Sequence, residues 1–554
     1  MTGSSDRGER GVGWCVQDPY LRLALQRIDG IIRREALIQR LLGWDPRDPY
    51  RGLLISDDEV DCLLQSLPAS HRIAPDAPSL KELDTKIREL EERLDDMDAP
   101  PRSHLGRLVA RLGLQSLERD ILLLALVTEI DPRYGRLFGF LQDDVTRSLP
   151  TPFLALNLLC PDEESRRWGR TCLLDGEPLR RYRVIRLLPS QQGSACPWVQ
   201  RGLQVDPHIS NYLLGLADDD PLLSEFVETF ACGAGDDSLG ISEAVQGRLV
   251  RLAQDPLVIY LKGPRGLGRI AAARTVCRRM ERGLMVVDLP CLMKSELSLN
   301  MALALVGRQA LLRRDVLFWD RVEALSDDPI ARGQWLSSVK RHGEGTFIAG
   351  EEGWVPLALR PDLPVMEIPL SVPGYETRKT LWERGLDGAY PLGSDVDVGR
   401  LANRFRFGEG QMRRVVATAC DIARGEGSER VDQSHVFRAC RANSNQRLSH
   451  LAQKVAPHYG WRDIVLPHDQ IRQLREIVNH VTYRPLVYGE WGFDKKLALS
   501  KGLNVLFVGG PGTGKTMAAD ILAGELGLDL YKIDLSMVVS KYIGETEKNL
   551  RRIF

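Results

Sequence analysis

Apolar residues recur at helical spacing in three segments near the start of the chain. Residues 20–42 form the first, which we expect to end as a helix at Gly43. A shorter amphipathic segment covers residues 60–67. Residues 80–97 carry a heptad seam, with Ser79 as the expected helix cap. Because that seam is short, we favour a helix that lies on its own domain over a coiled coil.

The next hundred or so residues mix helical segments with shorter apolar runs. Residues 117–124 predict a buried helix, and residues 183–188 predict a half-buried strand. A compact domain of helices and a hairpin, of the winged-helix kind, fits residues 103–220. Winged-helix modules often bind DNA, but this segment is not clearly basic, so we favour a role in protein docking or ring assembly.

From about residue 257 a strand, a loop and a helix follow one another, and the same order returns at residues 505–523. In the second copy, Val505–Val508 predicts the strand and Met517–Ala523 predicts the helix. Between them, Gly509–Thr516 fits the phosphate-loop pattern G-x-x-x-x-G-K-[ST] at every position. The alternative is a glycine-rich turn that matches by chance.

The residue types in this second loop are those that binding of phosphate and Mg²⁺ requires. Glycines let the backbone turn tightly and aim its N–H groups at phosphate oxygens. Lys515, the candidate catalytic residue, supplies a charge for the β- and γ-phosphates, and the Thr516 hydroxyl is the candidate Mg²⁺ ligand. We therefore predict ATP and Mg²⁺ as cofactors. The candidate nucleotide-binding residues of the loop are Gly509, Gly510, Pro511, Gly512, Thr513, Gly514, Lys515, Thr516 and Met517.

The first loop, Gly263–Ile270, has lost part of this chemistry. Gly263, Gly266 and Gly268 remain, but Arg269 replaces the lysine and Ile270 replaces the hydroxyl residue. A guanidinium is larger than an ammonium, and isoleucine cannot bind Mg²⁺. Residual phosphate binding by Gly266, Gly268 and Arg269 stays open.

A second loss follows at the end of the apolar run 316–320. Asp320 stands where a Mg²⁺-side carboxylate is expected, but Arg321 follows it where a glutamate would orient water. We predict a pseudo-ATPase domain kept for ring assembly or regulation. The alternative is an unrelated α/β domain with a glycine turn.

Composition narrows the function classes further. The 554 residues carry a net charge of −1, so no global charge favours nucleic acid or a membrane. The ten cysteines include no C-x-x-C pair, and so favour neither zinc nor a disulfide framework. The start has no apolar signal-peptide core, and the run 121–127 is too short to span a bilayer. We expect a cytoplasmic protein.

Several of these segments resemble the AAA ATPases, a family of ring-forming remodelling motors. Gly510–Thr516 resembles the phosphate loop of that family. Trp461–Ile464 resembles the segment that opens such modules, and the resemblance implies that Asp463 and Ile464 border the adenine. Ser540–Leu550 resembles the central pore loop, in which Tyr542 would grip an extended peptide; the alternative is an ordinary exposed loop aromatic. The family implies a homo-hexamer, ATP hydrolysis between subunits and work on a protein substrate.

The rest of the chain resembles more specific relatives. Residues 257–445 resemble a degenerate first module of the AAA family, and Asn403–Arg413 is similar to the helical lid of such a module. Thr346–Glu351 departs from the family, which usually has Thr-Asn after the strand at this place. The segments 117–122, 131–137 and 141–147 resemble bacterial ATPases that carry a variant winged-helix domain and are found beside contractile, phage-tail-like injection systems.

The expected fold class is α/β: an AAA-type P-loop NTPase module with a helical lid. A helical and winged-helix-like region precedes it, and the truncated start of a second AAA module follows it. The expected parts are 1–16 (disordered), 17–102 (helical), 103–220 (winged-helix-like), 221–375 (degenerate AAA α/β domain), 376–455 (lid) and 456–554 (second module).

No strand with an acid follows Thr516 in the last 38 residues, and the final residues have the pattern of a helix interior. We expect a fragment of a longer protein that by itself hydrolyses ATP poorly or not at all. For the full-length protein we predict an ATP-driven remodeller or unfoldase. The alternatives are a non-catalytic, nucleotide-gated scaffold and, more weakly, a DNA-bound regulator.

Overall fold

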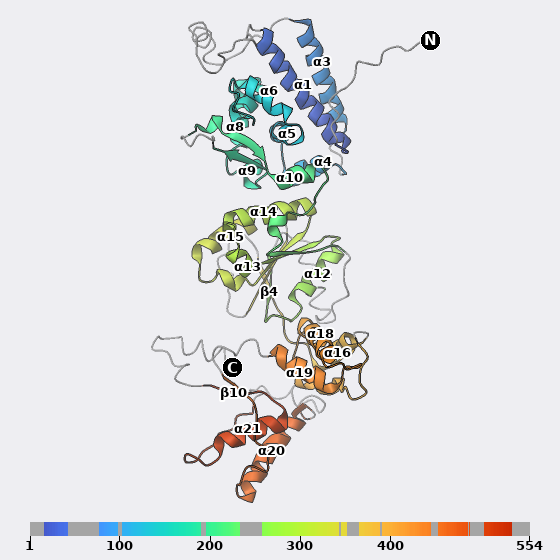
Figure 1. Ribbon diagram of the computed structural model, residues 1–554, viewed down its shortest axis with the longest axis vertical. Coiled ribbons are helices and arrows are strands. Elements are labelled where there is room, and N and C mark those ends of the chain that lie inside the picture. Colours follow the sequence, from blue (N-terminus) through green and yellow to red (C-terminus); the bar gives the residue numbers. More distant parts are fainter. Residues whose placement is uncertain are drawn as a thin grey trace, which may run out of the picture. The chain divides into compact units, whose positions relative to one another are not determined.

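The computed structural model describes residues 16–41, 77–97, 102–189, 196–232, 247, 258–342, 345–351, 365–387, 390–444, 453–485, 487 and 503–533. These residues fall into two compact units. Figure 1 labels many of the helices and strands along the chain. The first unit comprises residues 1–234, 252–260 and 277–366, and the second comprises residues 235–251, 261–276 and 367–554. Within the described ranges, no helix is long and apolar enough to cross a membrane.

The first unit begins with a helical region. Its elements are α1 (Pro19–Leu41), α3 (Pro78–Asp96), α4 (His104–Leu112), α5 (Ser116–Ile130), α6 (Arg133–Leu141), α7 (Pro152–Leu159), α8 (Glu163–Cys172), α9 (Pro178–Arg181), β1 (Ile185–Leu188), the 3₁₀ turn η1 (Trp198–Gln200), β2 (Gly202–Val205), α10 (Pro207–Leu213) and the 3₁₀ turn η2 (Pro221–Leu223). The predicted helix over residues 20–42 is confirmed as α1. The predicted amphipathic segment at residues 60–67 lies outside the described residues.

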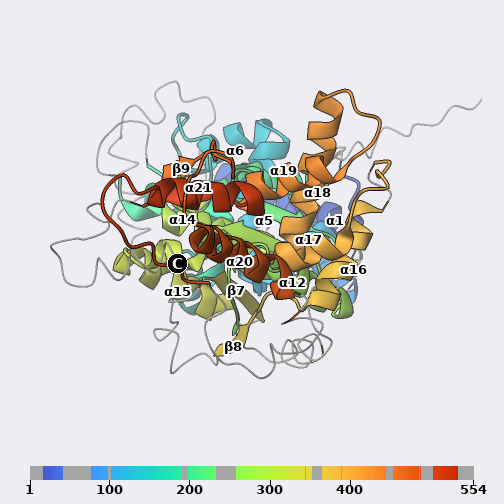
Figure 2. The same ribbon diagram turned by 90° about the horizontal axis from the view of Figure 1, so that it is seen from below.

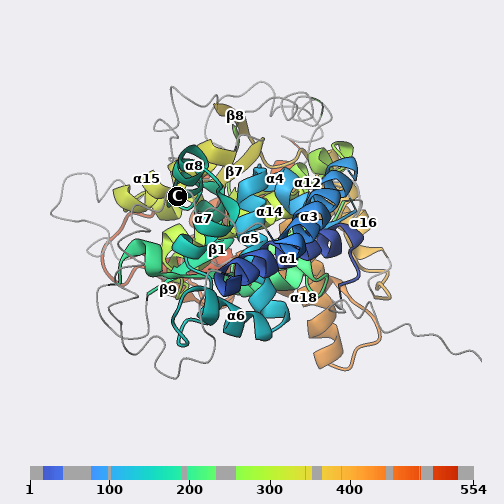
Figure 3. The same ribbon diagram turned by 90° about the horizontal axis from the view of Figure 1, so that it is seen from above.

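Helix α3 lies along α1, as Figure 3 shows from above. Arg27 of α1 pairs with Glu91 of α3 at 2.6 Å, and Gly30 leaves room for the Ile87 side chain. The heptad seam therefore packs on its own domain, as predicted. The predicted cap was wrong: α3 starts at Pro78, which suits the first helical position, so Ser79 lies inside the first turn.

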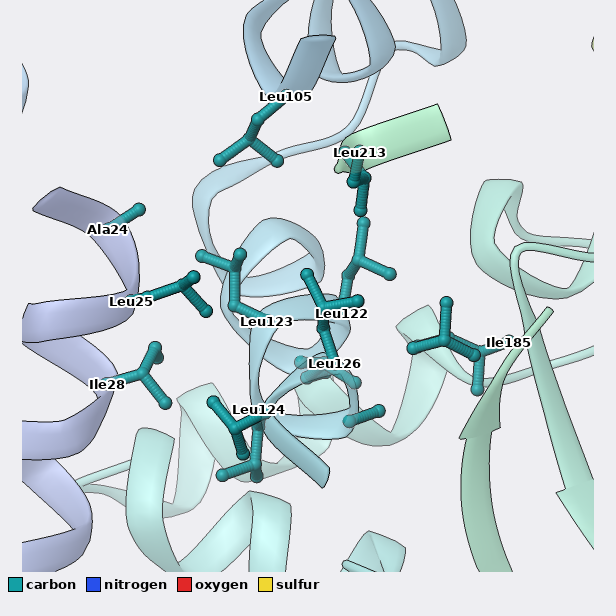
Figure 4. Packing of buried hydrophobic residues seen from close by; sticks show 14 of the residues in the cluster. Ala24, Leu25, Ile28, Leu105, Leu122, Leu123, Leu124, Leu126, Ile185 and Leu213 are labelled. Carbon is teal, nitrogen blue, oxygen red and sulfur yellow. The ribbon is translucent and has the colours of Figure 1, made fainter. Parts of the chain in front are cut away.

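Helix α5 forms the centre of this region's core (Figure 4). The predicted buried helix at residues 117–124 is confirmed, because Leu122, Leu123 and Leu124 have no solvent-exposed surface. Ile28 of α1 and Ile185 of β1 belong to the same cluster. Burial around most of its circumference explains why this helix lacks a marked polar face.

The strand predicted at residues 183–188 is confirmed as β1. It pairs antiparallel with β2, with Ile185 opposite Val205 and Leu188 opposite Gly202. This short hairpin, set against helices α5 and α9, gives the region the expected combination of helices and a wing.

A six-stranded sheet follows, with strand order β3-β5-β6-β7-β4-β8. Its elements and covering helices are β3 (Val227–Phe230), β4 (Val258–Lys262), α12 (Arg269–Arg279), β5 (Leu284–Asp288), α13 (Leu289–Lys294), α14 (Leu299–Arg313), β6 (Val316–Asp320), the 3₁₀ turn η3 (Val322–Leu325), α15 (Pro329–His342), β7 (Thr346–Gly350) and β8 (Val365–Pro369). Strands β5, β6 and β7 pair in parallel, and β3 pairs antiparallel with β5.

Every residue of β6 and β7 is buried, which explains their nearly continuous apolar sequences. Trp319 of β6 meets Trp335 of α15 edge to face, with ring centroids 6.0 Å apart. This sheet with its helices, together with the winged-helix region, confirms the predicted α/β fold class.

The second unit contains four helices of the lid type, α16 (Tyr375–Leu386), α17 (Val398–Arg404), α18 (Glu409–Gly425) and α19 (Gln433–Ser444). Trp382 and Phe407 lie in their common core. After them come β9 (Gln453–Val455), α20 (His468–Pro485), α21 (Lys515–Leu526) and β10 (Leu530–Lys532). Figure 2 shows α20 and α21 side by side.

Candidate nucleotide site

The second phosphate loop leads directly into α21. Gly512 and Gly514 have φ angles of 79° and 83°, in the left-handed region that residues with a β-carbon rarely adopt. Gly514 caps the helix and Lys515 is its first residue. The N–H groups of a first helical turn lack partners within the helix and lie at its positive end. The local geometry therefore suits a bound phosphate.

The ammonium of Lys515 is held within this loop by backbone carbonyl oxygens. Its Nζ donates to the carbonyl oxygens of Gly509 at 2.8 Å and Gly510 at 2.6 Å. The hydroxyl of Thr513 donates to the same Gly510 carbonyl at 2.9 Å. A cation held in this way is placed to exchange loop carbonyls for phosphate oxygens when an anion enters.

The donor set fits a triphosphate that carries its own Mg²⁺. Thr516 is exposed one residue after Lys515, so its hydroxyl is open to a metal that arrives with the phosphates. Within the described ranges, no group of three or more His, Cys, Asp or Glu side chains forms a separate metal site. When bound, Mg²⁺ would offset phosphate charge, while the loop and Lys515 would hold the phosphates.

The strand predicted before this loop is absent from the structure. Residues 503–510 have no regular secondary structure, although the helix predicted at residues 517–523 is confirmed as α21. Leu506 and Val508 are 86% and 85% exposed. A strand requires a partner for its backbone groups, and β10, the next strand in this unit, pairs with β9 instead. The apolar pattern of residues 505–508 is typical of a strand, but a strand also needs a partner strand, which the neighbouring residues do not determine.

The turn at residues 460–464 lies beside the helix start. The β-carbon position of Gly514 is 3.9 Å from Cδ1 of Ile464, which is buried with Ala518 and Ile521 of α21. The Asp463 carboxylate accepts from the Gly460 N–H at 2.7 Å and so shapes the turn. The structure thus brings Ile464 to the phosphate loop, whereas Asp463 is engaged within its own turn.

The first loop has the same backbone form but different side-chain contacts. Gly266 and Gly268 have φ angles of 88° and 83°, matching the two left-handed glycines of the second loop. Arg269 is only 5% exposed, and its Nη1 donates to the Gly263 carbonyl at 3.3 Å. The Gln411 side chain of α18 covers Gly266 so closely that a β-carbon there would overlap it. The side chains of Arg269 and Gln411 therefore both contact this loop.

Asp320 and Arg321 lie at the end of β6 in the first unit. Asp320 is buried as the last residue of the strand. Arg321 adopts a left-handed conformation with a φ of 61° and forms an ion pair with Asp288, which ends the neighbouring strand β5. The arginine in the place of a water-orienting glutamate therefore has a structural partner.

Two functional contacts escaped sequence reasoning, and one prediction falls outside the structure. Asp520 in α21 contacts backbone far away in the sequence and stands in no motif. Gln411 of α18 lies within the predicted lid segment 403–413, but its contact with Gly266 was not predicted. Tyr542 of the predicted pore loop lies outside the described residues.

Comparisons with known proteins agree with this architecture. Residues 19–227 match the variant winged helix domain, and residues 505–554 match the ATPase family associated with various cellular activities (AAA). The chain is therefore similar to a winged helix domain in one segment and to an AAA domain in another. Residues 374–446 match the contractile injection system ATPase helical domain. The predicted resemblance to AAA ATPases of contractile injection systems with a variant winged-helix domain is thereby confirmed.

Curated relatives share shorter stretches with this chain. The uncharacterized AAA family ATPase y4kL of Sinorhizobium fredii is 33% identical over 102 residues, 18% of this chain and 29% of that protein. The peroxisomal ATPase PEX6 of Penicillium chrysogenum is 28% identical over 133 residues, 24% and 9% of the two chains. The probable 26S proteasome regulatory subunit 10B of Caenorhabditis elegans is 35% identical over 86 residues, 16% and 20%. The chain thus spans less than a third of the length of these relatives.

Proposed function

We propose that this chain is the ATP-binding part of an AAA-type ATPase that remodels or unfolds a protein substrate and serves a contractile injection system. The second loop binds ATP with Mg²⁺, and the first module acts as a structural element of a homo-hexameric ring in the cytoplasm. Tyr542 contacts the substrate polypeptide. The family matches support the ATPase class, and the helical-domain match supports the link to injection systems.

One contrast carries the proposal for the two loops. The Lys515 ammonium lies in an exposed loop. The hydrogen bonds that the structure describes for it go to two backbone carbonyl oxygens of that loop. Arg269 at the matching position is buried beneath a loop that the lid covers. Of the two loops, the second is therefore the one in which a positively charged side chain is accessible to a ligand.

Equilibrium binding of a fluorescent ATP analogue tests this proposal. Lys515→Ala should weaken binding by ~tenfold or more, because charge-assisted hydrogen bonds to the phosphates are lost. Arg269→Ala is the matched control and should leave the affinity unchanged. An affinity that depends on Arg269 and not on Lys515 would contradict the assignment.

ATP turnover then separates the motor from the alternative scaffold. Turnover that is lost in Lys515→Ala and kept in Arg269→Ala would support a motor. Lys515-dependent binding without turnover, in an assembly that contains the complete AAA module, would support a nucleotide-gated scaffold instead.

A further inference from the structure

A cavity of about 280 Å³ lies in the first unit, between the winged-helix region and the α/β sheet. Helix α4, which contacts α14 (Figure 1), contributes part of its wall. The rest comes from the end of α14, the end of α15 and the segments that lead into β5, β6 and β7. Because these strands are parallel, the cavity lies at their amino ends, whereas Asp288 and Asp320 lie at the carboxyl ends.

Positive charge dominates the wall of this cavity. Three arginines line it, each from a different segment: Arg111 of α4, Arg282 before β5 and Arg314 after α14. Among the described residues of the wall, Asp315 is the one acid, and it lies 2.8 Å from the guanidinium of Arg313. Three arginines against one acid leave the wall cationic.

Backbone contacts hold two of these guanidinium groups in place. Nη1 of Arg111 donates to the carbonyl oxygen of Leu311 at 3.1 Å, and Nε of Arg282 donates to that of Arg314 at 2.9 Å. Both acceptors lie at the carboxyl end of α14, where a helix carries partial negative charge. Capping this helix end is a structural role for both arginines, and it also fixes their charge at the cavity.

The third arginine is unfavourable for its own backbone. Arg314 follows the end of α14 in the left-handed conformation, with a φ of 61°. Glycine is the usual residue at such a helix end, because a β-carbon is unfavourable there. The Arg314 residue is exposed and lines the cavity. An exposed cation at a strained position points to a function of the side chain rather than to packing.

We propose that this cavity binds a phosphate dianion, either inorganic phosphate or a small phosphate monoester. Guanidinium groups bind phosphate oxygens through paired, charge-assisted hydrogen bonds. A carboxylate carries one negative charge, whereas a phosphate monoester carries ~1.5 to 2 at neutral pH, which suits three arginines better. Ligand pockets usually measure about 300–1,000 Å³, so this cavity suits a ligand at the small end of that range.

Calorimetry with the full chain tests this inference. The Lys515→Ala background is used, because that change removes the cation of the second loop, which could bind phosphate as well. Inorganic phosphate and glycerol phosphate are the two probes, and we expect saturable binding of at least one. Arg314→Ala should weaken this binding by ~tenfold, because charge-assisted hydrogen bonds are lost. Arg314→Lys keeps the charge without the planar fork and should give an intermediate affinity.

Two further variants complete the set. Arg341→Ala is the matched control, because it removes an exposed arginine of α15 whose Nε donates to the Ser337 carbonyl and which does not line the described wall. It should leave the affinity unchanged. Arg111→Ala removes the cation that α4 contributes and should weaken binding as Arg314→Ala does. This variant keeps the inference testable if Arg314→Ala does not fold.

Tighter binding of glycerol phosphate would support the inference with a monoester as the ligand, and tighter binding of inorganic phosphate would support it with the free ion. A folded Lys515→Ala chain that binds neither probe would overturn the inference. Equal affinities in Arg314→Ala and Arg341→Ala would overturn it as well, since binding would then lie elsewhere. These outcomes do not bear on the proposed function of the second loop, because Lys515 is absent throughout.

Discussion

Gly408 lies directly on Gly266, so that a β-carbon at residue 408 would overlap the carbonyl oxygen of residue 266. The lid is thus packed on the first glycine loop without space between the two backbones. Gly408 itself has a φ of −84°, which any residue can adopt, so only this close approach requires glycine.

We predict that Gly408→Ala destabilises the protein by ~1–3 kcal/mol, the usual range for overpacking a close contact. Gly410→Ala is the control, because its β-carbon would meet Gly266 at an ordinary distance of 3.7 Å. That change lies within α18 and should be neutral or stabilising by up to about 1 kcal/mol. Urea denaturation measures both, and equal effects of the two changes would contradict the packing argument.

A buried ion cluster gives the second prediction, for the first unit. Arg308 of α14 has no exposed surface and pairs with Asp220 at 2.6 Å and with Asp206 at 3.3 Å. Both acids begin short helices of the winged-helix region, α10 and η2. The cluster therefore joins that region to the helix layer of the sheet.

Arg308→Ala should lower the free energy of unfolding by ~3–5 kcal/mol, because it leaves the buried Asp220 carboxylate without its cation, although Asp206 keeps its ion pair with Arg186. Arg133→Ala removes an arginine that is mostly exposed and should leave the denaturation midpoint nearly unchanged. A small loss in Arg308→Ala, comparable to that of Arg133→Ala, would show that water reaches the cluster.

The sequence predicted those features whose causes are local. Left-handed glycines, a lysine at a helix start and a continuous apolar strand such as residues 316–320 are visible in neighbouring residues. The failures have nonlocal causes. Val505–Val508 has the composition of a strand, yet strand formation depends on a partner. Asp520 reads as an ordinary acid in a helix, because the two backbone N–H groups that donate to its carboxylate lie 61 and 62 residues earlier in the chain.

The cysteines provide a third prediction, about access to the cores. Burial raises the pKa of Cys160 to about 11 and those of Cys172, Cys277 and Cys440 to about 12, so these groups stay protonated at neutral pH. Cys232 and Cys291 are exposed in the described part of the chain. Brief maleimide treatment followed by peptide mass spectrometry should modify the two exposed thiols and spare the five that are buried in the described part of the chain, which are these four and Cys420. Labelling in urea is the control, where all should react; rapid native labelling of Cys440 would contradict the packing of the lid.

The fourth prediction concerns acid sensitivity of the lid. The Arg438 guanidinium, and after it His435, hold the pKa of Glu426 below its usual value of 4.5. The Asp432 carboxylate accepts a hydrogen bond from the His435 backbone N–H at 3.0 Å, and this bond lowers the pKa of Asp432 as well. A carboxyl with a lowered pKa in the folded state stabilises the fold above its unfolded pKa, and this contribution is lost as pH falls through the folded pKa.

The lid should therefore lose stability as pH falls below 4.5, the usual glutamate value. Thermal denaturation of the full chain at about pH 7 and about pH 4 measures this loss. Glu426→Gln should lower stability at neutral pH and show a smaller further loss in acid, since the residue no longer titrates. Asp421→Asn is the control, because Asp421 is an exposed acid of α18, the helix that Glu426 caps, and lies 3.5 Å from Arg424. If Glu426→Gln and the wild type lost the same stability between these pH values, the contacts of Glu426 would not account for the acid response.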